Sequence, residues 1–151
     1  MKLRLHHVNV VSDDIKELHH FYAEVLGLET VPLPMMAFGE EKDRAEQGDA
    51  GQVGDGTGSE SVGVFDAGGE ELQIHAGRRQ AYLGPRMGQS VNPLLTGHFA
   101  FRSDDLDEVR KQLTDQGVPF SDYGEWSVKD WDQIFLTDPA GNVIEIHQVL
   151  R

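Results

Sequence analysis

Residues 133–148 read QIFLTDPAGNVIEIHQ, and this stretch has the pattern of a strand, a tight turn and a second strand. The Pro and Gly of DPAGN favour a chain reversal, and the residues that follow alternate between apolar and polar. This alternation places Ile144 and Ile146 on one face of the second strand and Glu145 on the other. A carboxylate in a buried strand is costly unless a cation meets it, so we expect Glu145 to have a cationic partner elsewhere in the chain.

The beginning of the chain is repeated in its second half. The segment HHVNVVSDDI at residues 6–15 aligns with GHFAFRSDDL at residues 97–106, which places His98 over His7. Each segment is a predicted strand that leads into a helix, and Ser12 is the predicted N-cap of the first helix. A repeat of this kind indicates that the fold consists of two similar halves.

The ends of the two halves are repeated as well. The segment GGEELQIH, which ends at His75, aligns with AGNVIEIH, which ends at His147, so that Gln73 lies over Glu145. Both segments are predicted strands. We therefore predict an α+β fold in which two βαβββ modules pair into a curled mixed sheet around a metal or ligand cavity.

The repeat also sets the expected boundaries of the modules. The first module covers residues 1–76, a linker covers residues 77–95, and the second module covers residues 96–151, all within one compact unit. The extra length of the first module falls in a charged, Gly-rich segment at about residues 40–60, which is too polar to bury an apolar core. We expect this segment to be a mobile loop, and the sequence leaves open whether it is a lid.

The composition excludes several classes of protein. The formal net charge of −13 disfavours binding to a nucleic-acid backbone. The chain has no cysteine, which excludes disulfides, thiolate nucleophiles and zinc fingers, so a metal ion would need His, Asp, Glu or amide ligands. The sequence has neither the pattern of a signal peptide nor that of a membrane span, and we expect a cytoplasmic protein with no membrane partner.

Four polar residues that the repeat relates to one another are candidates for a metal site. His7 and His98 lie in the first strand of each module, and Gln73 and Glu145 lie in the last. Each lies on the face opposite the aliphatic residues that cover the helices, so a curled sheet would bring all four together. Two imidazoles, a carboxylate and an amide oxygen suit a divalent ion such as Ni, Co, Zn, Mn or Fe, with one or two coordination positions left open.

The repeated segments resemble those of the vicinal oxygen chelate superfamily, which includes glyoxalase I, bleomycin-resistance proteins, fosfomycin-resistance enzymes, methylmalonyl-CoA epimerase and extradiol dioxygenases. The matching segments are HHVNVVSDD and FYAEVLGLE in the first half and GHFAFRSDDLDEV and DPAGNVIEI in the second. The resemblance implies metal ligands at His7, His98 and Glu145 and, as in some members, at Gln73. That set is similar to the one in methylmalonyl-CoA epimerase.

The resemblance further implies a metal-dependent lyase or isomerase that acts on a small carbonyl or hydroxy-carbonyl compound by proton transfer or elimination. Glu145 would be both a ligand and the proton acceptor, but only if it loosens from the metal. Two alternatives stay open: a metal-free protein that sequesters a drug or metabolite, as bleomycin-resistance proteins do, and an Fe(II)-dependent dioxygenase. Epimerases and glyoxalases provide a further carboxylate in their first half, and here the Gly-rich loop replaces that segment.

Other polar and aromatic residues are predicted to line the cavity. Asn9 shares a strand face with His7, and Gln133 begins the penultimate strand, so both amides are candidates for substrate binding. Tyr123 and Trp126 lie in a short aromatic segment and are candidates for the mouth of a small-molecule pocket. The exposed edges of a curled half-barrel usually need covering, so we also expect a homodimer.

Overall fold

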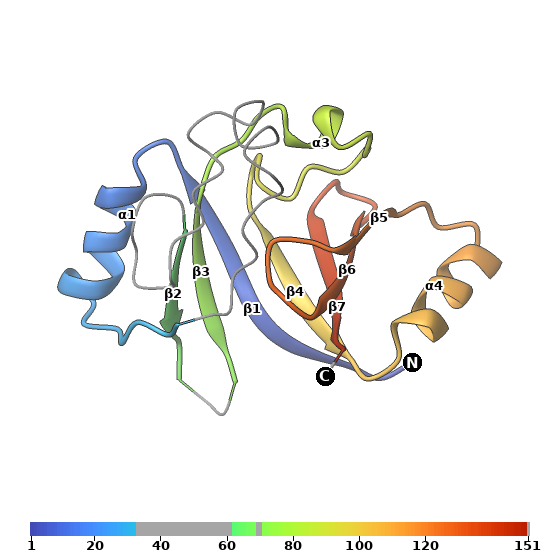
Figure 1. The fold of residues 1–151 in the computed structure, drawn as a ribbon, viewed down its shortest axis with the longest axis horizontal. Coiled ribbons are helices and arrows are strands. Elements are labelled where there is room, and N and C mark those ends of the chain that lie inside the picture. The colour runs from blue at the N-terminus through green and yellow to red at the C-terminus, as the bar shows by residue number, and fades with distance from the viewer. Residues whose placement is uncertain (33–61, 69–70, 151) are drawn as a thin grey trace.

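The computed structural model describes residues 1–32, 62–68 and 71–150. The predicted Gly-rich loop at residues 40–60 lies outside them. This loop replaces the segment that provides a further first-half carboxylate in epimerases and glyoxalases. Figure 1 shows the arrangement of the helices and strands. In chain order they are β1 (Leu3–Ser12), α1 (Ile15–His20), a π-helical turn η1 (Phe21–Val25), β2 (Val62–Asp66), β3 (Gln73–Arg78), α3 (Leu83–Arg86), β4 (His98–Ser103), α4 (Leu106–Asp115), β5 (Ser121–Glu125), β6 (Trp131–Thr137) and β7 (Val143–Val149).

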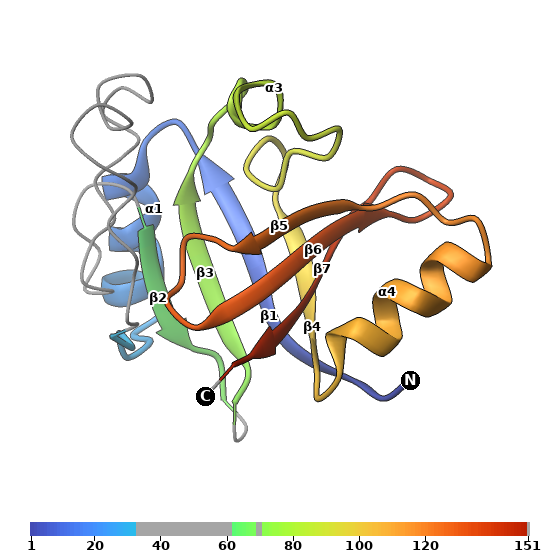
Figure 2. The same ribbon diagram turned by 45° about the vertical axis from the view of Figure 1, so that its right-hand side comes forward.

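The strands form one mixed sheet in the order β2-β3-β1-β4-β7-β6-β5. At its centre β1 and β4 are antiparallel, and each is parallel to the last strand of its own half, β3 or β7. The sheet curls without closing, and Figure 2 shows β5, β6 and β7 crossing in front of the central strands. The predicted α+β architecture, a curled mixed sheet with two related halves, is therefore confirmed.

Helices α1 and α4 lie at opposite ends of the molecule (Figure 1), and each begins at an aspartate. Asp14 accepts a hydrogen bond of 3.0 Å from the backbone N–H of Glu17, and Asp105 accepts one of 2.9 Å from that of Glu108. The prediction of Ser12 as the N-cap was wrong, because β1 continues through Ser12 and the helix starts later. The Ser12 hydroxyl instead accepts a bond from the backbone N–H of Asp14.

The apolar side of the sheet packs against these helices. Under α4 the buried cluster consists of Leu106, Val109, Ile134, Leu136 and Ile146, and under α1 it consists of Ile15, Phe65 and Ala76. Burial of each large side chain is worth about 1.5–3 kcal/mol, so these clusters fix which face of every strand points away from the helices. Polar side chains gather on that second, concave face. Within the described residues, no helix is both long and apolar enough to cross a membrane.

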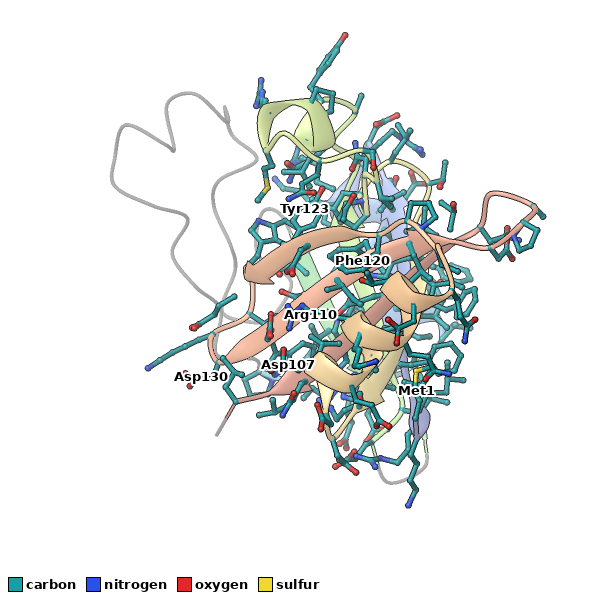
Figure 3. All side chains as sticks on the ribbon, turned by 90° about the vertical axis from the view of Figure 1, so that its right-hand side faces the viewer. Met1, Asp107, Arg110, Phe120, Tyr123 and Asp130 are labelled. Carbon is teal, nitrogen blue, oxygen red and sulfur yellow. The ribbon has the colours of Figure 1, made fainter. Side chains whose placement is uncertain are left out.

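The segment between β3 and β4 folds over the second half of the sheet. It contains the short helix α3, and Leu83 of this helix packs with Tyr123, Trp126 and Phe135. The Tyr123 hydroxyl donates a hydrogen bond of 2.7 Å to the backbone carbonyl of Val91 in the same segment. Figure 3 shows Tyr123 on the side of the sheet that faces α3. This packing closes one end of the concave face.

A β-bulge interrupts the pairing of β1 with β4. Leu5 pairs with Phe101 and His7 pairs with Ala100, which leaves His6 as the extra residue of β1. Because the bulge breaks the alternation, His6 and His7 are both buried, with exposed fractions of 3% and 1%. In a regular strand, consecutive side chains would point to opposite faces.

Candidate metal centre

A row of paired residues crosses the middle of the concave face. Gln73 of β3 pairs with His7, which in turn pairs with Ala100 of β4. Ala100 pairs with Glu145 of β7, so the row runs across both halves of the sheet. Ala100 is fully buried and carries only a methyl group, and therefore the side chains of His7 and Glu145 meet above it. His98, two residues before Ala100 on β4, points to the same place.

His7, His98 and Glu145 present ligand atoms that all lie within 4.8 Å of one another. The Nε2 of His98 is 3.0 Å from Oε2 of Glu145, and the Nε2 of His7 is 3.3 Å from the same oxygen. Two ligand atoms bound at right angles to an ion, each at about 2.1 Å, are about 3.0 Å apart. The spacing and the donor types therefore fit a divalent ion, as the sequence predicts.

The ring of His98 is oriented for this role by a backbone carbonyl. Its Nδ1 lies 2.8 Å from the carbonyl oxygen of Pro93, which can only accept a hydrogen bond. In neutral His98 the proton is therefore on Nδ1, and Nε2 presents a lone pair toward Glu145. A lone pair and a carboxylate oxygen at 3.0 Å repel each other unless a cation lies between them. A metal-ligating histidine typically donates its second ring N–H in this way.

Glu145 is only 2% exposed, yet its surroundings favour the ionised carboxylate. Burial alone would raise the pKa of its carboxyl group, but the surrounding imidazoles of His7, His147 and His98 outweigh burial and hold the pKa well below the usual value. The other carboxylate oxygen, Oε1, accepts a hydrogen bond of 3.1 Å from the side-chain amide of Gln133. The sequence predicted a cationic partner for Glu145, and the described residues surround it with imidazoles and an amide.

Gln73, the predicted fourth ligand, is engaged elsewhere. Its Oε1 lies 2.9 Å from Nε2 of His75, two residues along the same strand. His75 in turn stacks on the ring of His7, with the centroids 3.7 Å apart. Gln73 thus supports the ring behind His7, and a ligand role for Gln73 stays a prediction.

Two residues that contact this site were not predicted from the sequence. His6 places its Nδ1 2.9 Å from Nδ1 of His7, and Arg102 places a guanidinium nitrogen 2.8 Å from Nε2 of His6. His6 could have been suspected from the histidine pair, but only a bulge turns it inward, and the sequence does not mark the bulge. Arg102 lies on the same face as His98 by alternation, and that spacing was the available signal.

The two consecutive histidines of β1 are held neutral. Burial lowers the pKa of His7 to about 4, although Glu145 partly opposes the shift. Burial and, after it, the charge of Arg102 lower the pKa of His6 to about 2. At neutral pH each ring therefore carries one proton, and its location is decided by the hydrogen-bond partners.

The amides predicted to bind substrate lie in the concave face. Asn9 and Gln133 are 8% and 2% exposed. Among the residues that the structure describes, the Oδ1 of Asn9 and the Oε1 of Gln133 have no hydrogen-bond partner. Buried acceptors are nearly always satisfied, so these two oxygens are suited to donors of a bound molecule or to water. Their role in substrate binding stays a prediction.

The aromatic residues predicted to line the mouth of the pocket pack behind the site. Tyr123 and Trp126 are 8% and 9% exposed, and their rings lie 5.0 Å apart. Tyr123 contacts Phe135, and Phe135 contacts His98 at a centroid distance of 5.4 Å. They therefore form a wall behind His98, and direct contact with a substrate stays a prediction.

The comparison with known families gives one match over most of the chain. The sequence profile of the Glyoxalase/Bleomycin resistance protein/Dioxygenase superfamily matches residues 4–146. No curated protein sequence matches the chain significantly.

Solved structures with the same fold include several from this superfamily. A variant of Streptomyces coelicolor methylmalonyl-CoA epimerase, in complex with 2-nitronate-propionyl-CoA, is 17% identical with a TM-score of 0.61, covering 99% of this chain and 100% of that one. Methylmalonyl-CoA epimerase from Mycobacterium tuberculosis is 18% identical with a TM-score of 0.58, covering 95% of this chain and 86% of that one. A superfamily member from Vibrio splendidus 12B01 is 12% identical with a TM-score of 0.51, covering 97% and 99%. At these identities the likeness establishes the fold alone.

Proposed function

Because the chain belongs to the glyoxalase/bleomycin resistance protein/dioxygenase superfamily, we propose that it is a divalent-metal-dependent isomerase or lyase. Its substrate would be a small carbonyl or hydroxy-carbonyl compound, and the reaction a proton transfer or elimination at the carbon next to the carbonyl. The observation that carries the proposal is the short spacing of His7, His98 and Glu145, whose ligand atoms lie within 4.8 Å of one another.

His7, His98 and Glu145 would hold one divalent ion, of Ni, Co, Zn, Mn or Fe. When bound, such an ion supplies Lewis-acid stabilisation of the negative charge that develops on a substrate oxygen. Gln73 supports the site through His75, and it would become a ligand only by giving up its contact of 2.9 Å.

Glu145 is the proton acceptor in this proposal. Its depressed pKa keeps the carboxylate ionised at neutral pH but makes it a weak base, so Glu145 would accept a proton only on loosening from the ion. The amide of Gln133 holds Oε1 at 3.1 Å, so that Oε2 is the oxygen directed at the histidines. The partnerless oxygens of Asn9 and Gln133 would accept hydrogen bonds from a hydroxyl or amide of the substrate.

The test combines metal content with proton exchange. Protein loaded separately with Ni, Co, Zn, Mn and Fe is expected to keep about one ion per chain, and His98→Ala is expected to lose it. His20→Ala, which removes an exposed histidine of α1, is the matched control and should keep the ion. Deuterium incorporation next to the carbonyl of 2-hydroxy ketones and acyl thioesters would then be followed by NMR. Protein that retains none of the five ions would contradict the proposal.

A dioxygenase is the second candidate, and the contact of Gln73 with His75 favours it. With Gln73 engaged by His75, the remaining ligands are two histidines and one carboxylate, which is the set typical of non-haem Fe(II) oxygenases. Consumption of oxygen by the Fe(II)-loaded protein in the presence of catechols would decide for this reaction.

A metal-free binding protein is the third candidate, since Glu145 already has donors around it. Gln133 and the rings of His7 and His147 approach its two oxygens without an ion. Tight binding of an aromatic drug or metabolite by protein that holds no metal and turns nothing over would decide for this function.

We also propose that two chains associate, and that the protein works in the cytoplasm. Leu5 and Val8 of β1 are 52% and 41% exposed, and large exposed apolar groups side by side on a central strand favour a covering partner. Val8→Lys is expected to shift the sedimentation coefficient from dimer to monomer. A wild-type chain that sediments as a monomer at every concentration would contradict association.

A further inference from the structure

We propose that Arg102 is a positioning residue that decides which ring nitrogens of His6, His7 and His147 carry a proton. Through these rings one guanidinium directs two N–H groups at the two oxygens of Glu145. This assignment goes beyond the proposed reaction and does not depend on it, because it concerns the protein before any ion or substrate binds.

The guanidinium of Arg102 is held firmly in place. Its central carbon lies 5.1 Å from the centre of the Trp131 ring, and one of its nitrogens lies 3.6 Å from a carboxylate oxygen of Glu71. The side chain is only 18% exposed. Trp131 also stacks on His147, with the centroids 4.2 Å apart and the planes 9° from parallel. Arginine keeps its proton at all ordinary pH values, and every N–H of the group can only donate.

The first chain of contacts runs through the bulge of β1. Arg102 approaches Nε2 of His6 at 2.8 Å, so this nitrogen must accept, and the single proton of neutral His6 is on Nδ1. That proton points at Nδ1 of His7, 2.9 Å away, which must therefore accept as well. The proton of His7 is then on Nε2, the nitrogen 3.3 Å from Oε2 of Glu145.

The second chain runs through β7. Arg102 donates a hydrogen bond of 3.1 Å to Nε2 of His147, which leaves the proton of His147 on Nδ1. This Nδ1 lies 3.0 Å from Oε1 of Glu145. The angle falls outside good hydrogen-bond geometry, so the contact is chiefly an electrostatic one between the N–H dipole and the carboxylate. Both oxygens of Glu145 thus face an N–H group whose position Arg102 determines.

The two predicted metal ligands are consequently not equivalent. In its neutral form His98 turns a lone pair toward Glu145, because its Nδ1–H donates to the carbonyl of Pro93, whereas His7 turns an N–H toward the same oxygen. One effect on metal binding rests on the proposed metal site. Arg102 stabilises the tautomer of His7 whose Nε2 carries a proton and cannot bind an ion, so replacing Arg102 should strengthen metal binding.

A second metal site in the neighbouring histidines is the competing interpretation. His6, His7 and His147 also bring ligand atoms within 4.8 Å of one another. Arg102 bonds to Nε2 of two of these three rings, at 2.8 and 3.1 Å, and its positive charge beside them disfavours a second cation. The resident cation of this cluster is therefore the guanidinium.

The test reads the ring protons directly. In metal-free, ¹⁵N-labelled protein at neutral pH, long-range ¹H–¹⁵N spectra distinguish protonated from bare ring nitrogens, with single histidine substitutions for assignment. We expect the proton on Nδ1 in His6 and His147 and on Nε2 in His7. Arg102→Met, which keeps an unbranched apolar stem and removes the donors, should abolish this pattern. Arg102→Lys, which keeps the charge but cannot span two rings, should preserve at most one of the two chains.

Arg4→Met is the matched control, because Arg4 pairs with Arg102 across β1 and β4 but bonds to Asp104. This variant should leave all three rings unchanged. A wild-type His6 with its proton on Nε2 would overturn the proposal, and so would a folded Arg102→Met with an unchanged pattern. If Arg102→Met does not fold, the wild-type spectrum and Arg102→Lys still decide.

Calorimetry with Zn²⁺ or Ni²⁺ gives a second measurement. Arg102→Met should bind about 10-fold more tightly than the wild type and Arg4→Met, a change of the size that outer residues of metal sites produce. Weaker binding by Arg102→Met would overturn this consequence. Absence of binding by every variant would remove the proposed metal enzyme, while the spectra of the metal-free protein would still test the role of Arg102.

Discussion

β1 and β4 lie side by side at the centre of the sheet and carry histidines at repeated positions, but they surround those histidines differently. Just before β4, Gly97 brings the chain close to β1, and on β4 the ring of His98 bonds to the backbone carbonyl of Pro93. On β1, a bulge adds His6, and the ring of His7 bonds to that second ring. The difference teaches that a duplicated position keeps its place in the sheet, while residues that differ between the two halves set its chemistry.

The largest predicted difference between the surroundings of the two strands is a loss of stability in acid, measured on the metal-free protein. Burial lowers the pKa values of His6, His7 and His75, all in the first half, to about 2, to about 4 and well below the usual value. Such groups take up protons more readily when unfolded, so the free energy of unfolding falls as the pH drops below about 6.5. Three protons correspond to about 4 kcal/mol per pH unit between about pH 6 and 5.

Urea unfolding at a series of pH values measures this slope. His75→Gln is expected to reduce it by about one proton, whereas His20→Gln, on the surface of α1, should leave it unchanged. The depressed pKa of Glu145 adds stability that is lost only at lower pH, below its unfolded value of about 4.3. A wild-type slope of less than one proton in this window would show that the rings of β1 are hydrated.

The next prediction concerns Glu145, which the histidines of both β1 and β4 approach. Glu145→Gln keeps the size of the side chain but removes the charge that His7 and His98 approach. Loss of an outer residue of a metal site typically costs 10–100-fold in affinity, so we expect a loss of more than about 100-fold here. Calorimetric titration with Zn²⁺ measures it, with Glu125→Gln on the exposed end of β5 as the control. Equal affinities would exclude Glu145 as a ligand.

The third prediction concerns Gly97, where the chain that enters β4 comes close to β1. Gly97 has a φ of +84°, and a Cβ there would stand 2.5 Å from the carbonyl oxygen of Asn9. Gly97→Ala should therefore lower the free energy of unfolding by about 3 kcal/mol and displace His98. Gly117→Ala is the matched control, because Gly117 has a φ of +68° but open space around it. Its cost should be about 1 kcal/mol, and equal losses in denaturant unfolding would mean that the contact with Asn9 is easily relieved.

The smallest effect ranks the two histidines against each other. Because His98 presents a lone pair to Glu145 and His7 an N–H, His98→Ala should weaken metal binding about 10-fold more than His7→Ala. Parallel titrations of the two variants with Ni²⁺ measure the ratio. A greater loss in His7→Ala would reverse the ranking of the two strands.

Much of this arrangement could be predicted from the sequence because the repeat is a pattern of backbone position. Alternation within strands placed His7, His98 and Glu145 on one face, and the structure brings those three together. The turn before β7 is also as predicted, with the backbone N–H of Asp138 bonded to the carbonyl of Asn142 at 3.0 Å. Each of these inferences needs only regular geometry.

The rest could not be predicted because it depends on departures from regular geometry and on contacts between distant segments. A bulge, which leaves no mark in the residue types, turns His6 inward. Gln73 is at the position expected of a ligand, but its rotamer takes it to His75. The start of α1 at Asp14 rather than Ser12 likewise depends on how far β1 extends.

Ala100 gives the fold a simple evolutionary route between activities. Its methyl group is the only side chain between His7 and Glu145 in the row that crosses the sheet, and it is fully buried. A larger residue there would separate the two side chains, while the apolar face that packs against the helices points the other way. A lineage with this fold could thus lose or regain the site through exchanges at a single codon, at a packing cost of about 1–3 kcal/mol at this fully buried position.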